Sequence, residues 1–246
     1  MAVLCCRKAI ASFIIALACT SIVNAKVYLV SVGIADYAGT KSDLCSPVND
    51  ANSMINLYKN DVDTSYRLLT DTDATIENIS KAMEIFSLAE TDDVVLFYYS
   101  GHGYHGGLSV YDGRIDYATI RHLIARSKCK NKLMFIDTCF SGGITNISHS
   151  FKADRRCPED ANVILFLSSR SDEYSRSHKT LKNAYFTHFL QKGLQGYADI
   201  DENRIVTARE LFVYVHNNVK RISKNRQHPV MWGQFPDDAP IIKRIY

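Results

Sequence analysis

The chain has 246 residues, of which 46% are hydrophobic and 22% are charged, and its formal net charge is +3. This is the composition of a globular protein, and the length suits one large domain, so a disordered or fibrous protein is excluded. The small charge and the absence of basic runs interleaved with aromatic residues argue against a nucleic-acid partner.

The N-terminal segment has the pattern of a secretory signal peptide. Arg7 and Lys8 form a basic region, residues 9–18 are apolar but too few to cross a bilayer, and Val23-Asn24-Ala25 offers small residues before a cleavage point. We therefore predict that residues 1–25 are removed and that the mature chain, beginning at Lys26, is periplasmic or secreted and free of the membrane. A buried N-terminal helix is the alternative interpretation.

Four of the seven cysteines lie outside this leader: Cys45, Cys129, Cys139 and Cys157. An exported protein meets conditions that permit disulfides. One bridge among Cys45, Cys129 and Cys157 is compatible with a free Cys139, but the spacing does not decide whether any bridge forms.

Apolar runs and helical periodicities alternate along the rest of the chain. In chain order the predictions are a strand at 27–33, a helix at 47–59, strand 66–69, helix 75–88, strand 94–99, a hairpin around 108–111, helix 116–127, strands 133–137 and 162–167, and helices 183–194 and 211–221. This alternation predicts an α/β fold, in which helices cover both faces of a mostly parallel sheet. The proline-containing end of the chain suits an edge strand.

Two short motifs follow neighbouring strands and carry the chemistry. They are Tyr98-Tyr99-Ser100-Gly101-His102-Gly103 and Asp137-Thr138-Cys139-Phe140-Ser141-Gly142-Gly143. Ligands of open α/β sheets bind outside the carboxyl ends of the strands, so we expect His102 and Cys139 to meet there. A thiolate is a strong nucleophile, and a nearby imidazole both favours it and protonates the leaving amine.

The same motifs offer the remaining parts of a nucleophilic site. The backbone amides of Gly103 and Cys139 are expected to face the oxyanion that develops during attack on a carbonyl. Taken singly, a buried cysteine and a hydrogen-bonded surface histidine are the ordinary interpretations of Cys139 and His102. Their joint occurrence after two strands, with glycines on both sides, favours catalysis.

The motif pair resembles the caspase-like cysteine peptidases and, within them, the metacaspase branch with its bacterial relatives. The family pattern is one strand ending in Ser-Gly-His-Gly and another ending in Asp-x-Cys-x-Ser-Gly, whereas caspases proper carry Gln-Ala-Cys at the second motif. The resemblance implies a caspase-like three-layer sandwich with a six-stranded sheet and a Cys139–His102 dyad. It divides a single domain at 26–246 into a large-subunit-like part (26–143), a linker (144–160) and a small-subunit-like part (161–246).

The resemblance also implies a pocket for the residue before the scissile bond. Residue by residue, it places substrate contacts at Asp50, Ser100, Asp137, Ser168 and Asp172. Two carboxylates and a hydroxyl favour Arg or Lys through charge-assisted hydrogen bonds and would repel an Asp side chain. Alternatively, Asp50 satisfies free amides in the first turn of a helix, Asp137 is a structural acceptor, and Ser168 and Asp172 belong to an ordinary surface loop.

The expected function is therefore an exported cysteine endopeptidase that acts on peptides and proteins after Arg or Lys. The linker contains Lys152, Arg155 and Arg156, so such an enzyme would be able to cut itself there, although an ordinary solvated loop is the alternative. Two other functions stay open, namely cleavage after Asp as in true caspases and a non-catalytic secreted binding module. The chain departs from the family at Pro47, where a cysteine is usual.

No cofactor is required for this chemistry, and no spacing of Cys and His indicates zinc. Calcium is the open question, because residues 199–210 imitate the spacing of an EF-hand loop. Asp199, Asp201, Asn203 and Glu210 stand at ligand positions, but Arg204 occupies the place that needs glycine. A helix capping box already accounts for Glu210.

Overall fold

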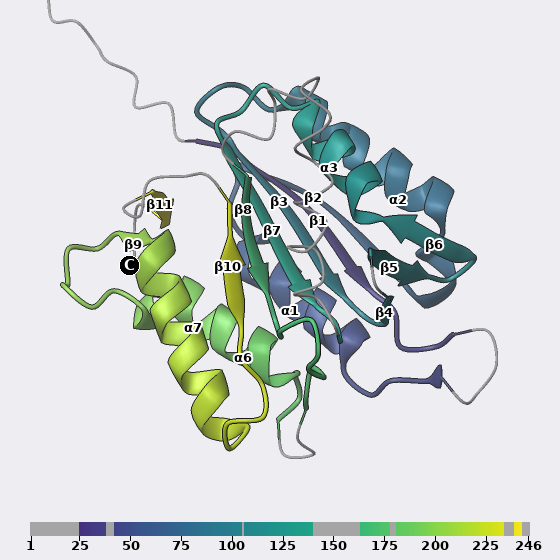
Figure 1. Cartoon of the computed structure of the whole chain (residues 1–246). Coiled ribbons are helices and arrows are strands. Elements are labelled where there is room, and N and C mark those ends of the chain that lie inside the picture. The colour runs from purple at the N-terminus through teal and green to yellow at the C-terminus, as the bar shows by residue number, and fades with distance from the viewer. Residues whose placement is uncertain are drawn as a thin grey trace, which may run out of the picture.

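The computed structural model describes residues 25–37, 42–104, 106–139, 163–177, 181–233 and 239–242. Figure 1 shows a three-layer α/β architecture, in which a central sheet is covered by helices on both faces. The predicted leader and the linker 144–160 lie outside the described residues. Within the described part of the chain, no helix combines the length and apolarity needed to span a membrane.

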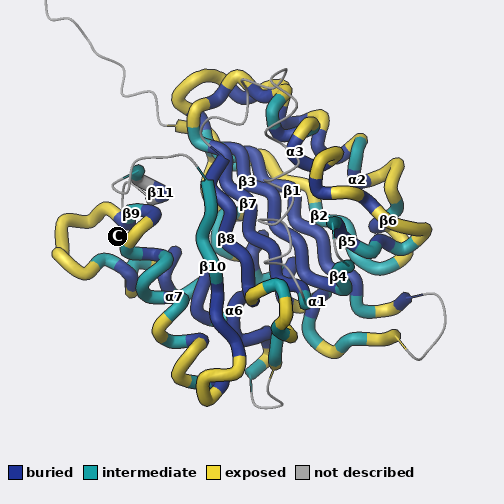
Figure 2. The backbone as a smooth tube through the Cα atoms, viewed as in Figure 1, coloured by how far each residue is buried: buried dark blue, intermediate teal, exposed yellow. Residues whose placement is uncertain are grey.

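The central sheet has six strands in the order β10–β8–β7–β3–β1–β2. Their bounds are β1 (Val27–Gly33), β2 (Thr64–Thr70), β3 (Val94–Ser100), β7 (Asn131–Asp137), β8 (Val163–Leu167) and β10 (Val230–Trp232). All neighbours pair in parallel except β10, which runs antiparallel to β8. The predicted mostly parallel sheet is confirmed, and Figure 2 shows its central strands buried.

Two layers of helices sandwich this sheet. One face carries α1 (Pro47–Tyr58), α6 (Tyr185–Lys192) and α7 (Ala208–Ile222), and the other carries α2 (Ile76–Ala82), the 3₁₀-helix η3 (Met83–Leu88) and α3 (Tyr117–Ala125). Because side chains alternate along a strand, β3 sends Phe97 and Tyr99 into one core and Leu96 and Tyr98 into the other. Continuous apolar strands therefore serve both layers.

Smaller elements complete the fold. The predicted hairpin is a three-stranded antiparallel sheet formed by β4 (Gly103–Tyr104), β5 (Gly107–Val110) and β6 (Gly113–Asp116). Helix α6 continues into a π-helical turn, η5 (Gly193–Tyr197). Strand β9 (Val206–Thr207) pairs with β11 (Pro240–Ile242), and a further 3₁₀ turn, η2, spans Asp71–Asp73.

A capping box sets the start of α7. The Thr207 hydroxyl accepts from the Glu210 N–H at 3.2 Å, and the Glu210 carboxylate accepts from the Thr207 N–H at 3.0 Å. Two amides of the first turn are thereby satisfied, so the helix begins at Ala208 rather than at the predicted residue 211.

The pairing register of the central sheet aligns the carboxyl ends of three strands. Gly33 pairs with Ser100, and Ser100 pairs with Asp137, so β1, β3 and β7 end side by side. Gly33 also lies against the start of α1, because a Cβ at this position would sit 2.3 Å from the Pro47 carbonyl oxygen. The sheet thus places the two motifs and the first turn of α1 at one edge.

Candidate active site

A pocket opens at the carboxyl ends of β3 and β7, where the two motifs begin. It brings together four of the predicted site residues: His102, Cys139, Ser100 and Asp137. Its other lining residues are Leu44, Cys45, Ser46, Pro47, Gly101, Ser175, Arg176, Ser177 and Ala184. The predicted nucleophile, the imidazole and two of the predicted substrate contacts therefore share one site.

Backbone and tyrosine groups fix the imidazole of His102. Its Nε2 lies 2.7 Å from the carbonyl oxygen of Ser42. A carbonyl oxygen only accepts, so in the neutral ring Nε2 carries the proton and Nδ1 keeps the lone pair. The Tyr37 hydroxyl accepts from the His102 N–H at 2.7 Å, and the two ring centroids are 4.8 Å apart. The Tyr99 hydroxyl, 3.2 Å from that of Tyr37, donates to the His102 carbonyl at 2.8 Å.

The Cys139 thiol is partly buried next to this imidazole-bearing loop. Burial raises its pKa, and the nearby Asp137 carboxylate adds to this, while a hydrogen bond from the Ser175 backbone and the charge of Arg176 oppose it. Gly103 permits the close approach of the two motifs, because a Cβ there would lie 2.6 Å from Thr138 Oγ1 and 3.0 Å from the Cys139 carbonyl oxygen.

Asp50 is completely buried beside the pocket, although it comes from α1. Its Oδ1 accepts from Asn183 Nδ2 at 2.8 Å and from the Ala184 N–H at 3.1 Å, and its Oδ2 accepts from the Ser100 hydroxyl at 3.0 Å. These donors come from β3 and from the turn before α6, not from the first turn of α1. Burial, and then the charge of Asp137, raise the pKa of Asp50 to about 7.

Asp137 is the second buried carboxylate of the site. Its Oδ1 accepts from the Ser175 hydroxyl, and its Oδ2 accepts from the Thr187 hydroxyl at 2.7 Å and the Thr187 N–H at 3.3 Å. Burial raises the pKa of this carboxyl as well. The hydrogen-bond donors named for Asp50 and Asp137 are all neutral, so none of them supplies a positive charge to balance the pair.

Four of these donors, Ser175 among them, were not found by sequence reasoning. The other three lie at or just before the start of α6: Asn183 and Ala184 are 133 and 134 positions from Asp50, and Thr187 is 50 positions from Asp137. A run of ordinary helix-forming residues carries no local sign of such contacts. Only the packing of α6 beside α1 brings them to the carboxylates.

The structure does not bring Ser168 or Asp172 to the pocket. Ser168 is completely buried, and its hydroxyl accepts from the Thr138 N–H at 3.1 Å and donates to the Thr138 carbonyl at 3.0 Å. It therefore supports the backbone just before Cys139. Asp172 is exposed, and the pocket wall is formed three residues further on, at Ser175.

The cysteines other than Cys139 are free where they are described. Cys45 is exposed and lines the pocket, and Cys129 is buried, with its Sγ 3.4 Å from the Asn131 carbonyl oxygen. Cys157 lies outside the described residues. The open question of a bridge that involves Cys157 therefore stays open.

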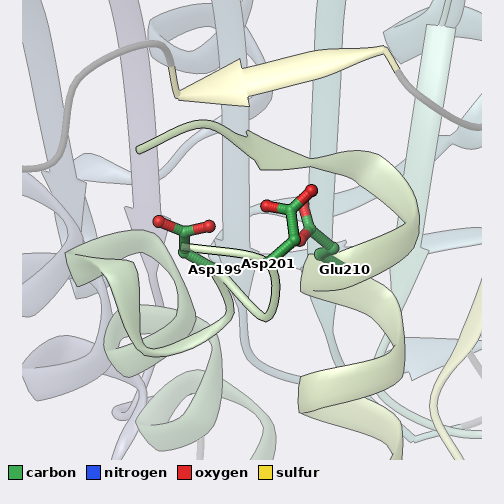
Figure 3. Close-up of side chains that lie close together, drawn as sticks. All are labelled: Asp199, Asp201 and Glu210. Atoms are coloured by element: carbon green, nitrogen blue, oxygen red, sulfur yellow. The ribbon is translucent and has the colours of Figure 1, made fainter. Parts of the chain in front are cut away.

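The acidic loop that imitates an EF-hand gathers three carboxylates (Figure 3). Oxygen atoms of Asp199, Asp201 and Glu210 lie within 4.8 Å of one another. Asp199 accepts from the backbone of Arg204 at 2.9 Å, and Glu210 is engaged in the capping box described above. Arg204 has a φ of 66°, the left-handed conformation that glycine favours. Hydrogen bonds of the loop itself thus account for these carboxylates, and calcium binding stays a prediction.

Comparisons with known proteins agree with this architecture. The family model described as Caspase domain matches residues 27–239, so the chain belongs to the caspase family of cysteine peptidases. A comparison with curated protein sequences finds no match.

Two solved structures illustrate the shared fold. Protein GSU0716 from Geobacter sulfurreducens is similar with a TM-score of 0.64 and 16% identity, over 89% of this chain and 97% of that chain. Caspase-1 from Spodoptera frugiperda is similar with a TM-score of 0.67 and 17% identity, over 89% and 90%. At such low identity the likeness shows the fold alone. The predicted caspase-like α/β fold is confirmed, and the family implies a hydrolase that acts on protein substrates.

Proposed function

We propose that this protein is an exported cysteine endopeptidase that cleaves peptide bonds after Arg or Lys, with Cys139 as nucleophile and His102 as acid–base. One observation carries the proposal. Two buried carboxylates, Asp50 and Asp137, stand beside a pocket that contains both a thiol and an imidazole, and their hydrogen-bond donors are neutral.

The reaction follows from the placement of the proton on His102. Nδ1 takes the proton of the Cys139 thiol as Sγ bonds to the carbonyl carbon, and the backbone amides of Gly103 and Cys139 stabilise the oxyanion. His102 then protonates the leaving amine as the C–N bond breaks. Water attacks the thioester after giving a proton to His102, the C–S bond breaks, and the thiol regains its proton.

Selectivity follows from the charge of the pocket. An arginine or lysine side chain would form charge-assisted hydrogen bonds with Asp50 and Asp137 and relieve their mutual repulsion. An aspartate would add a third negative charge to the same buried site. Ser100 takes part by donating its hydroxyl to Asp50, which holds that carboxylate in place.

The remaining parts of the proposal concern processing and conditions. Residues 1–25 would be removed on export, and an enzyme with this selectivity would cut its own linker near Lys152, Arg155 or Arg156. The chemistry uses no metal, so calcium would act through structure at 199–210 rather than in the bond-breaking steps.

Peptide hydrolysis tests the proposal directly. The purified protein is assayed with peptides that differ only in an Arg, Lys or Asp before the fluorogenic group, with calcium and with a chelator. We expect cleavage after Arg and Lys that is lost in Cys139→Ala and retained in Cys129→Ala, a matched control at a buried cysteine away from the pocket. Preferred cleavage after Asp would indicate caspase-type selectivity, and no turnover of any peptide would favour a binding module.

A further inference from the structure

Gln227 lies behind the wall of the pocket, and its side chain is completely buried. It follows α7 and does not line the pocket. Its Nε2 donates to the Ser168 carbonyl at 2.9 Å and to the Ser175 hydroxyl at 3.3 Å, and its Oε1 accepts from the Arg176 N–H at 3.0 Å. One carboxamide thus holds both ends of the segment 168–176.

These contacts fix the direction of the Ser175 hydroxyl. An amide nitrogen only donates, so Ser175 Oγ accepts from Gln227. The single hydroxyl hydrogen of Ser175 is then free to be donated to Asp137 Oδ1, which is the contact observed. Gln227 therefore acts on Asp137 through one intervening hydroxyl group.

The neighbouring residue anchors the same segment at its middle. The His228 N–H donates to Glu173 at 2.7 Å, and the His228 ring nitrogen Nδ1 lies 2.6 Å from the other oxygen of that carboxylate. Residues 227–228 thus hold the wall at Ser168, Glu173 and Arg176. This wall also supplies the backbone that contacts the Cys139 thiol.

We propose that Gln227 is a positioning residue for substrate selection, which orients the Ser175 hydroxyl toward Asp137 and so keeps that carboxylate aligned for a basic side chain. The inference rests on the proposed function, because it concerns how the same pocket selects Arg or Lys. A residue that supports the pocket wall from behind, without lining the pocket itself, would then set the preference of the enzyme.

The test separates selection from general support of the fold. Two irreversible peptide inhibitors, identical except for arginine or the uncharged norleucine at the first position, are reacted with the protein, and the ratio of their inactivation rates is measured. Gln227→Met keeps the shape but removes all three hydrogen bonds. Gln227→Glu keeps an acceptor for the Arg176 N–H and remains informative if the first variant does not fold, which thermal unfolding reports.

Gln191→Met is the matched control. Its Nε2 is buried without a hydrogen-bond partner among the described residues, and the residue does not line the pocket. We expect the arginine-to-norleucine ratio to fall about tenfold in Gln227→Met, the effect of losing one hydrogen bond that supports a charged group, and to stay unchanged in Gln191→Met.

A double-mutant cycle shows whether Gln227 acts through Ser175. The ratio for Ser175→Ala combined with Gln227→Met is expected to equal that for Ser175→Ala alone. An equal fall in the inactivation rates of both inhibitors in Gln227→Met would overturn the inference, and so would additive effects in the cycle. Either result would leave the wild-type preference for arginine intact. A wild-type ratio near one would overturn the proposed selectivity itself, and the inference with it.

Discussion

Replacing Asp50 by Asn should stabilise the protein at alkaline pH while it weakens cleavage after Arg. The change removes a buried negative charge and nearly preserves the shape of the side chain. The carboxamide oxygen still accepts from Asn183 and Ala184, whereas its nitrogen replaces the oxygen that accepted from Ser100. The hydroxyl of Ser100 must then turn and accept instead of donating.

The magnitude follows from the pKa of Asp50, which the folded protein raises from 3.8 to about 7. A raised carboxyl pKa means that folding favours the protonated form, so stability is complete below the unfolded value and is lost as pH rises toward the folded value. A shift of about three units corresponds to about 4 kcal/mol above pH 7. Rearranging the Ser100 hydrogen bond costs about 1–2 kcal/mol.

The assay is urea or thermal unfolding of wild type and Asp50→Asn at about pH 4 and pH 8, where the ionisation differs most. We expect a gain of about 2–3 kcal/mol at pH 8, or about 5–10 °C in unfolding temperature, and no gain at pH 4. Hydrolysis of the Arg peptide by the same variant should fall about tenfold or more.

Equal destabilisation of Asp50→Asn at both pH values would refute the reasoning, because it would show that ionisation of Asp50 costs the folded state nothing. Asp50→Ala is the less suitable variant, since it also leaves the Ala184 N–H without its acceptor. Full retention of Arg cleavage in Asp50→Asn would instead contradict the role of this carboxylate in substrate binding.

Three further outcomes are expected. Because burial raises the pKa of the Cys139 thiol, its alkylation by iodoacetamide should increase with pH through a midpoint above about 8.5, and a midpoint below neutrality would show a resting thiolate instead. Tyr37→Phe removes the acceptor of the His102 N–H and should lower kcat about tenfold with little change in KM, whereas Tyr28→Phe, whose hydroxyl lies elsewhere, should not. Wild-type protein should show fragments cut within 144–160 that are absent in Cys139→Ala, and fragments that persist in that variant would exclude self-cleavage.

The positions of the residues at strand ends could be predicted from the sequence, because each of them directly follows an apolar segment that forms a strand. Ser100 and Asp137 end apolar runs, and parallel strands bring their carboxyl ends to one edge, so His102 and Cys139 had to follow at the same edge. Asp50 was reached only through the family resemblance. The mostly parallel sheet and its two helix layers followed from the alternation of strand and helix patterns, whereas the order of the strands in the sheet was not predicted.

Contacts between distant segments could not be placed in this way. The donors Asn183 and Thr187 reach the carboxylates through helix packing, and Gln227 reaches Ser175 from 52 positions away. Ser168 follows a strand, as a cleft residue would, but its hydroxyl turns inward to the backbone of Thr138. A sequence pattern gives the position of a polar side chain along the chain, but not the direction in which it points.

The contact between Gly33 and the Pro47 carbonyl has a consequence for the depth of the pocket. A Cβ at Gly33 would sit 2.3 Å from the Pro47 carbonyl oxygen and 2.7 Å from Ala51 Cβ, so the helix that carries Asp50 rests directly on the end of the strand. Core substitutions elsewhere can loosen the packing, but they cannot bring α1 closer to β1. Redesign of the proposed Arg/Lys pocket for a longer or shorter side chain would therefore have to begin at this glycine.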